Sequence, residues 1–193
     1  MSLTLPTSKI PASTTNPQFL VLIGREKVGK TSALAQLDSN LIIDLEGGST
    51  FVDAMAIQCR TISDLGEAAS AIRAKNKEVG HNFYKHITID NATSLEEICL
   101  GYAATLYRQQ PMGKNWTGTD VRTLPQGSGY YYLRTAVLKV IDMFKELCDE
   151  FILVGHIKDT IVDDPATGEE LTERSLDLVG KLAGMVCRRC DGV

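Results

Sequence analysis

Apolar residues gather in short runs along the chain, and the segments between these runs carry apolar residues at helical spacing. The continuous runs Phe19–Ile23 and Phe151–Val154 are typical of parallel strands that are buried on both faces. We expect two more strands at Leu41–Leu45 and His86–Asp90. Apolar positions three or four residues apart predict helices at 31–37, 63–79, 93–109, 130–150 and 179–189. This alternation predicts an α/β fold of three layers with a mostly parallel central sheet.

Two regions depart from this alternation. Residues 111–129 have no period and are rich in glycine and proline, so we interpret them as a long loop, which in a compact domain is usually functional. Residues 160–172, with turn residues at 164–168, predict a β-hairpin. At the helix starts, we expect Ser63 to cap one helix and Thr93 or Ser94 to cap the next.

The length of 193 residues fits a single domain. Residues 1–18 are rich in Ser, Thr and Pro, and we expect them to form a flexible N-terminal arm. Residues 19–193 are then the folded domain. The sequence stops at Val193 directly after a helical pattern, so we expect either that the natural protein continues or that this is a shortened form of it.

The composition, with 44% hydrophobic and 23% charged residues, is that of a soluble globular protein. No apolar run approaches the ~20 residues of a membrane helix, and no signal-peptide pattern precedes the first strand, so we expect an intracellular protein. The formal net charge of −4 is not typical of a nucleic-acid-binding protein, although a local basic loop can bind nucleic acid within an acidic protein. The five cysteines are expected to be reduced thiols.

The segment after the first strand fits the phosphate-loop pattern G-x-x-x-x-G-K-[ST] at every fixed position. In such a loop, glycines let backbone N–H groups converge on phosphate oxygens, next to the positive end of a helix. Lys30 is expected to reach the β- and γ-phosphates, and Thr31 to bind Mg²⁺. We therefore expect ATP with Mg²⁺ to contact Gly24, Arg25, Glu26, Lys27, Val28, Gly29, Lys30, Thr31 and Ser32.

Three further strand ends carry groups suited to phosphate chemistry, and the carboxyl ends of parallel strands meet at one edge of a sheet. Asp90 ends an apolar strand and would hold Mg²⁺ through water. Glu46 would orient and deprotonate the attacking water. Asp44 would support Glu46 or serve as a further metal ligand, and a purely structural hydrogen bond explains it nearly as well. His156 could sense the γ-phosphate or be structural.

Four blocks in this order resemble the RecA-like recombinase ATPases, in particular the short phage-encoded members described as AAA-type NTP-binding or single-strand-annealing proteins. The blocks are Gly24–Thr31, Ile43–Gly47, Ile87–Asp90 and Phe151–Lys158. The resemblance implies a RecA-like P-loop fold and catalytic roles for Lys30, Glu46 and His156. It also implies an ATPase of phage-type DNA recombination or strand annealing, in the cytoplasm of a bacterial or phage-infected cell.

The same resemblance implies that two loops contact single-stranded DNA. The first is 111–129, which offers Lys114, Trp116 and Arg122, a mixture suited to phosphate contacts and base stacking. The second is the hairpin, which is acidic here and so departs from the family pattern. Members of the family form rings or filaments through an N-terminal arm, and we therefore expect a homo-oligomer.

Three other functions stay open. A small GTPase would use Asp44–Gly47 as D-x-x-G, but this motif follows the phosphate loop very closely and no Asn-Lys-x-Asp guanine signature occurs. A small-molecule kinase would need an Arg-rich lid, and residues 111–129 hold one arginine. The third alternative is a non-catalytic, nucleotide-bound scaffold in DNA metabolism.

Cys187 and Cys190 form a single C-x-x-C pair, which is half of a zinc site. Since the chain has no second pair, two buried thiols are the simpler interpretation, and residues beyond Val193 in a longer protein could complete a site. Arg188 and Arg189 lie between the cysteines and are candidates to act on a neighbour's γ-phosphate as arginine fingers.

Overall fold

The computed structural model describes residues 17–163 and 168–193. Its centre is a six-stranded sheet with the spatial order β1-β5-β4-β2-β3, and β6 pairs with the far part of β5. The strands are β1 (Phe19–Gly24), β2 (Asn40–Asp44), β3 (Ala56–Gln58), β4 (His86–Asp90), β5 (Glu150–Asp163) and β6 (Glu170–Leu176). Every pairing is parallel except that of β5 with β6. The predicted α/β class with a mostly parallel sheet is confirmed.

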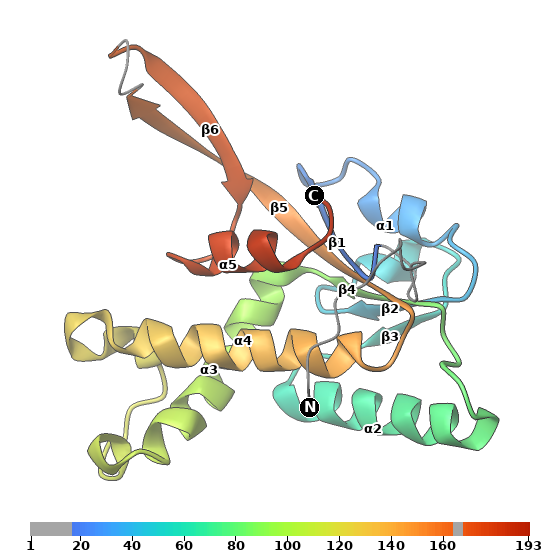
Figure 1. The fold of residues 1–193 in the computed structure, drawn as a ribbon, viewed down its shortest axis with the longest axis horizontal. Coiled ribbons are helices and arrows are strands. Elements are labelled where there is room, and N and C mark those ends of the chain that lie inside the picture. The colour runs from blue at the N-terminus through green and yellow to red at the C-terminus, as the bar shows by residue number, and fades with distance from the viewer. Residues whose placement is uncertain (1–16, 164–167) are drawn as a thin grey trace, which may run out of the picture.

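Helices cover the two faces of the sheet unequally (Figure 1). The helices are α1 (Lys30–Leu34), α2 (Ile62–Val79), α3 (Ala92–Arg108), α4 (Gly129–Lys145) and α5 (Leu182–Arg189). Successive residues of a strand point to opposite faces, so Ile43 joins the large core with Leu95 and Leu133, whereas Ile42 joins a small cluster with Leu34 of α1. The fold therefore has three layers, and the layer formed by α1 is thin.

Beyond the sheet, β5 continues and pairs with β6 in an antiparallel hairpin that projects from the body of the domain (Figure 1). The predicted hairpin is confirmed, but the segments expected as two separate strands, Phe151–Val154 and 160–163, belong to one continuous strand. A side chain at residue 155 would displace the end of the Leu176 side chain at the base of the hairpin, because a Cβ on Gly155 would overlap it.

The helix caps differ from the prediction. α2 begins after Thr61, whose hydroxyl accepts from the N–H of Asp64 while the Asp64 carboxylate accepts from the N–H of Thr61. Ser63 therefore lies inside the helix and is not its cap. α3 begins after Asn91, which accepts from the N–H of Ser94 at 3.0 Å, so the two residues predicted to cap α3 lie in its first turn. Several Ser, Thr, Asp and Asn residues are adjacent at both starts, and all of these types can cap.

The long loop predicted at 111–129 is packed against the domain. Three short 3₁₀ turns run through it, and Val121 and Leu124 are buried in the main core. Gly129 starts α4 so close to this loop that a Cβ on it would lie 1.6 Å from the carbonyl oxygen of Val121. The aperiodic sequence therefore encodes a close-packed connection between α3 and α4.

The C-terminal residues lie along β1. Asp191 accepts hydrogen bonds from the N–H groups of Gln18 and Phe19 at 2.8 and 2.9 Å, and Gly192 pairs with Leu20. The predicted N-terminal arm lies outside the described residues except for its last two, and so does most of the predicted hairpin turn. Among the helices that the structure describes, none is long and apolar enough to cross a bilayer.

Candidate functional site

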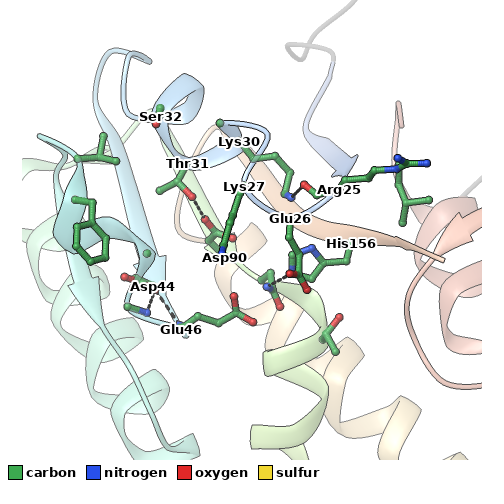
Figure 2. Close-up of a pocket in the computed structure, with 18 of the residues that line it drawn as sticks. Arg25, Glu26, Lys27, Lys30, Thr31, Ser32, Asp44, Glu46, Asp90 and His156 are labelled. Atoms are coloured by element: carbon green, nitrogen blue, oxygen red, sulfur yellow. Dashed lines mark hydrogen bonds between the residues drawn. The ribbon is translucent and has the colours of Figure 1, made fainter.

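The chain turns back over the end of β1 to reach α1, and this turn is the predicted phosphate loop. It needs left-handed backbone at Lys27 and Gly29, with φ values of 59° and 90°, and glycine adopts this conformation without steric cost. The amine of Lys30 lies 3.1 Å from the carbonyl oxygen of Gly24 and 2.7 Å from that of Arg25. The loop therefore curls around the Lys30 side chain between a strand and a helix (Figure 2).

The hydroxyl of Thr31 donates to Oδ2 of Asp90 at 2.6 Å and so joins the phosphate loop to the end of β4 (Figure 2). Burial raises the pKa of Asp90, and the nearby carboxylates of Asp44 and Glu46 add to that rise. A buried carboxylate among like charges is stabilised by a cation, and hydroxyl and carboxylate oxygens are ligands that Mg²⁺ prefers. Thr31 and Asp90 therefore fit a Mg²⁺ site.

Asp44 is the register neighbour of Asp90 at the end of β2, but the loop behind β2 encloses its carboxylate. Its oxygens accept from the Ser49 hydroxyl and from the backbone N–H groups of Glu46, Gly47 and Ser49. Burial alone would raise the pKa of Asp44, but these hydrogen bonds outweigh it and lower the pKa below its ordinary value. The geometry therefore favours the structural interpretation of Asp44 over a role as metal ligand.

Glu46 is exposed and lines a cavity that Thr31 and Asp90 also line. Its Oε1 accepts a hydrogen bond of 2.8 Å from the hydroxyl of Ser94, which lies in the first turn of α3. A general base must be both accessible to water and held in place. The position of Glu46 meets both conditions.

His156 ends the parallel part of β5, opposite Gly24 of β1, and its Nε2 lies 2.8 Å from Nδ2 of Asn91. Asn91 is itself buried and directly follows Asp90 in the chain. Nδ1 of His156 is buried and has no hydrogen-bond partner within the described residues. The candidate sensor is therefore tied to the neighbour of the candidate metal ligand.

These groups line one cavity of about 1120 Å³, a size that accommodates a nucleotide. From the phosphate loop, the lining includes Arg25, Glu26, Lys27, Gly29, Lys30, Thr31 and Ser32; from the strand ends, it includes Asp44, Glu46, Asp90 and His156. Of the predicted loop residues, only Gly24 and Val28 do not line it. Four segments far apart in the sequence thus meet at one site (Figure 2).

Sequence reasoning missed one aromatic residue at this cavity. Phe51 ends the 3₁₀ turn Gly48–Phe51 behind β2 and is 90% exposed, yet it belongs to the cavity lining. An aromatic ring at the edge of a cavity can stack on a flat ligand. The available signal was an aromatic residue shortly after Glu46 in a loop of small residues.

The residues predicted to contact DNA from 111–129 do not line this cavity, and two of them are occupied elsewhere. Arg122 forms an ion pair with Glu97 at 2.6 Å. Trp116 packs edge-on against Tyr107, with the ring centroids 5.3 Å apart. Lys114 is exposed. Arg122 and Trp116 therefore stabilise the packed loop, and Lys114 has no ion-pair partner within residues 17–163 and 168–193.

The C-terminal C-x-x-C pair is half-buried, and the thiol of Cys190 donates to the carbonyl oxygen of Cys187 at 3.2 Å. Within residues 17–163 and 168–193, no group of three or more His, Cys, Asp or Glu side chains could hold a metal ion. Arg189 pairs with Asp142, whereas Arg188 lines a second cavity between α4 and α5.

A family model described as "AAA domain" matches residues 16–192, nearly the whole chain. The chain belongs to this AAA domain family. The matched range contains the phosphate loop and all the strand ends that line the cavity, so this AAA domain is a nucleotide-binding P-loop NTPase domain. Members of this class generally use a nucleotide with Mg²⁺. No curated protein matches the chain.

Proposed function

We propose that this AAA domain binds ATP with Mg²⁺ and hydrolyses it to ADP and phosphate. The proposal is carried by the 2.6 Å contact between the Thr31 hydroxyl and the Asp90 carboxylate, inside a cavity that Lys30 and Glu46 also line. A phosphate loop alone accounts for phosphate binding. The contact of Thr31 with Asp90 adds a pair of oxygen ligands for a metal ion, and Glu46 adds a base, so the cavity holds the groups that phosphoryl transfer to water requires.

Each group has its own role in the proposed reaction. The loop N–H groups and the Lys30 amine bind phosphate oxygens. Thr31 and Asp90 would hold Mg²⁺, which neutralises charge on the β- and γ-phosphates when bound. Glu46 accepts a proton from water as the water oxygen bonds to the γ-phosphorus and the bond from that phosphorus to the bridging oxygen of ADP breaks.

Phe51 supports a nucleotide base at the edge of the same cavity. An exposed aromatic ring can stack on a base, which is worth ~1–3 kcal/mol and tolerates any base. Stacking alone therefore does not distinguish ATP from GTP. The absence of an Asn-Lys-x-Asp signature from the sequence favours ATP over GTP.

Phosphate release from ATP and from GTP, with and without Mg²⁺, tests this proposal. We expect Mg²⁺-dependent ATP turnover that is lost in Lys30→Ala and kept in Lys139→Ala, a matched control because Lys139 is exposed on α4 away from the cavity. Glu46→Gln should bind fluorescent ATP normally but turn it over at least ~100-fold more slowly.

Other outcomes would favour the alternatives. Tight ATP binding without turnover in the wild-type protein would indicate a nucleotide-bound scaffold. A strong preference for GTP would indicate a GTPase, and turnover that needs a small acceptor would indicate a kinase. Unchanged turnover in Glu46→Gln would remove Glu46 as the base.

We further propose single-stranded DNA as the macromolecular partner, which a role in phage-type recombination or strand annealing requires. Support comes from a second cavity of about 570 Å³ between α4 and α5. Its lining within the described part of the chain includes Arg134, Lys181, Arg188 and the exposed Tyr131 but no acidic residue. Among the described residues, none of these three cations has an ion-pair partner. Cations for the phosphates and an aromatic ring for the bases suit single-stranded nucleic acid.

Fluorescence anisotropy with a labelled single-stranded oligonucleotide, at several salt concentrations, tests this partner. Arg134→Glu and Arg188→Glu should each weaken binding roughly tenfold and lower its salt dependence. Lys139→Glu makes the same charge change on α4 outside the cavity and is the control. Weakening by Lys114→Glu alone would place the contact in the 111–129 loop instead, and no binding by the wild-type protein would exclude DNA as the partner.

A further inference from the structure

The first turn of α3 contacts two groups that the proposed reaction uses. Asn91 caps the helix and reaches His156 on β5, while Ser94 reaches Glu46 behind β2. We propose that Asn91 and Ser94 are positioning residues for ATP hydrolysis, and that this single turn holds the candidate base and the candidate sensor at a fixed separation. The inference rests on the proposed hydrolysis and extends it to two residues to which the proposed function gives no role.

The hydrogen bonds of Asn91 determine the orientation of its amide. Its Oδ1 accepts from the N–H of Ser94 at 3.0 Å, so the other end of the amide, Nδ2, faces His156. An amide nitrogen can only donate, and Nε2 of His156, 2.8 Å away, must therefore accept. A ring nitrogen that accepts carries no proton, so Asn91 selects the neutral ring of His156 with its proton on Nδ1.

A neutral His156 ring adds no positive charge to the site. Protonation of His156 on Nε2 would set two donors against each other and break the contact with Asn91. Held in this way, the ring can report on the γ-phosphate through its position. The Nδ1–H group is buried and has no partner among the described residues, so Asn91 is the group within the described chain that holds the ring.

Ser94 acts in the same way on Glu46. Its hydroxyl donates to Oε1 of Glu46 at 2.8 Å across 48 positions of sequence. A carboxylate on an exposed loop loses rotational freedom when one oxygen is held, and the other oxygen can then face the attacking water. Restricting a catalytic group to its reactive geometry lowers the barrier through orientation.

The turn is rigid enough for this task because the core holds it. Asn91, Ala92 and Leu95 have exposed fractions of 1%, 1% and 0%, and the turn starts directly after Asp90. Movement of the turn relative to Asp90 would therefore disturb the packing of the main core. The same packing that fixes the candidate metal ligand also fixes the two side chains that hold His156 and Glu46.

NMR of protein labelled with ¹⁵N-histidine tests the positioning role of Asn91 and requires no ATP turnover. We expect His156, identified by the signal missing in His156→Gln, to show a protonated Nδ1 and an unprotonated Nε2. Asn91→Ser keeps a residue that can cap α3 but is too short to reach the ring, so the signal should shift to a mixture of ring forms. A proton on Nε2 in the wild-type protein, or an unchanged signal in Asn91→Ser, would overturn the positioning role of Asn91.

Steady-state kinetics of ATP turnover test the positioning role of Ser94. Ser94→Ala should lower kcat by roughly 10–100-fold with KM unchanged, and Ser94→Thr, which restores a hydroxyl, should recover most of it. Ser70→Ala is the matched control, since the Ser70 hydroxyl bonds to the carbonyl oxygen of Gly66 within α2. The double variant Ser94→Ala/Glu46→Gln should be no slower than Glu46→Gln alone, because residues that act as a unit are not additive.

The results separate this inference from the proposed function. If the wild-type protein does not turn over ATP, the proposed hydrolysis fails and the positioning role fails with it, whatever the NMR experiment shows of the ring. If turnover is normal in Ser94→Ala, or if its loss adds to that of Glu46→Gln, the hydrolysis stands and the positioning role is wrong.

Discussion

The ends of β2 and β4 make the instructive comparison in this molecule. Asp44 and Asp90 are register neighbours on adjacent parallel strands, and each comes directly after a buried apolar run. Yet hydrogen bonds from the loop behind β2 lower the pKa of Asp44 against the opposing effect of its burial. By contrast, burial raises the pKa of Asp90, whose carboxylate has one hydrogen-bond donor among the described residues, Thr31.

The two strands differ in the segment that the chain enters next. After β2 the chain turns around Asp44, and its backbone N–H groups satisfy the carboxylate, so that Asp44 shapes the loop carrying Glu46 and Phe51. After β4 the chain enters α3 at once, and Asp90 is left facing the phosphate loop. A strand-end carboxylate is therefore structural when its own loop satisfies it and is available to a ligand when the loop does not.

The largest expected effect is on turnover at the β4 end. Asp90→Asn should lower ATP turnover at least ~1000-fold, because Mg²⁺ loses a charged ligand while the contact to Thr31 survives through the amide oxygen. The free energy of unfolding should not fall, because the substitution removes a buried charge. Steady-state turnover and chemical denaturation measure the two quantities.

Asp53→Asn provides the control, because Asp53 is an exposed carboxylate behind β2 that does not line the cavity. It should change neither quantity. A destabilised Asp90→Asn protein with normal turnover would reverse the roles assigned to the two strand ends.

The second largest expected effect is a loss of folding stability when Asp44, at the end of β2, is replaced. Asp44→Asn should cost about 3 kcal/mol, because the amide group cannot accept all four hydrogen bonds and leaves buried donors unpaired. For a chain of this length, that corresponds to a fall in Tm of roughly 6–12 °C, which calorimetry would measure. An unchanged Tm would show that the loop does not depend on Asp44.

The pH dependence of stability, measured without Mg²⁺ or nucleotide, should separate the two carboxylates. The pKa of Asp44 is lowered from 3.8, so its stabilisation is full at neutral pH and is lost only as the pH falls below that value. The pKa of Asp90 is raised from 3.8, so its contribution to stability is present at low pH and is lost as the pH rises through its native pKa.

Relative to the wild-type protein, Asp44→Asn should therefore be least stable at pH 7, and this deficit should shrink below pH ~4. Asp90→Asn should be more stable than the wild-type protein at pH 7, and this gain should vanish on acidification. Denaturation series across pH 3–8 would show opposite slopes. Parallel curves for the two variants would contradict the comparison.

The smallest expected effect concerns the loop that Asp44 shapes. Phe51→Ala should weaken ATP binding roughly fivefold, because a base loses a stacking surface, with Tm unchanged since the ring is exposed. Binding titrations with ATP and with inorganic triphosphate would check this. Equal weakening for both ligands would show that Phe51 does not contact the base.

Much of the fold could be predicted from the local pattern of apolar and polar residues. The apolar runs of β1, β2 and β4 and the periodicity of α2 and α3 predict those elements to within a few residues, because each pattern reports burial directly, whereas β5 extends nine residues beyond its predicted end and α4 stops five residues before its own. The edge strand β3 was missed because three residues carry too short a pattern to detect. The exposed Phe51 was missed because exposure depends on packing and not on residue type.

In the candidate site, too, local features could be predicted from the sequence and long-range contacts could not. The phosphate loop was recognisable because eight consecutive residues contain its chemistry. By contrast, Arg122 was predicted to face DNA, and its ion pair with Glu97 joins residues 25 positions apart. The contact of Asn91 with His156 spans 65 positions. Neither contact has a counterpart in the local pattern that could have indicated it.

The sequence by itself determined the strand–loop–helix that binds phosphate, since its conformation depends on neighbouring residues, on glycine at a left-handed position and on an apolar strand before it. Tertiary structure alone decided which strand-end carboxylate is free. Asp44 and Asp90 look alike in sequence, and only the donors that folding brings to each of them separate a structural residue from a candidate metal ligand.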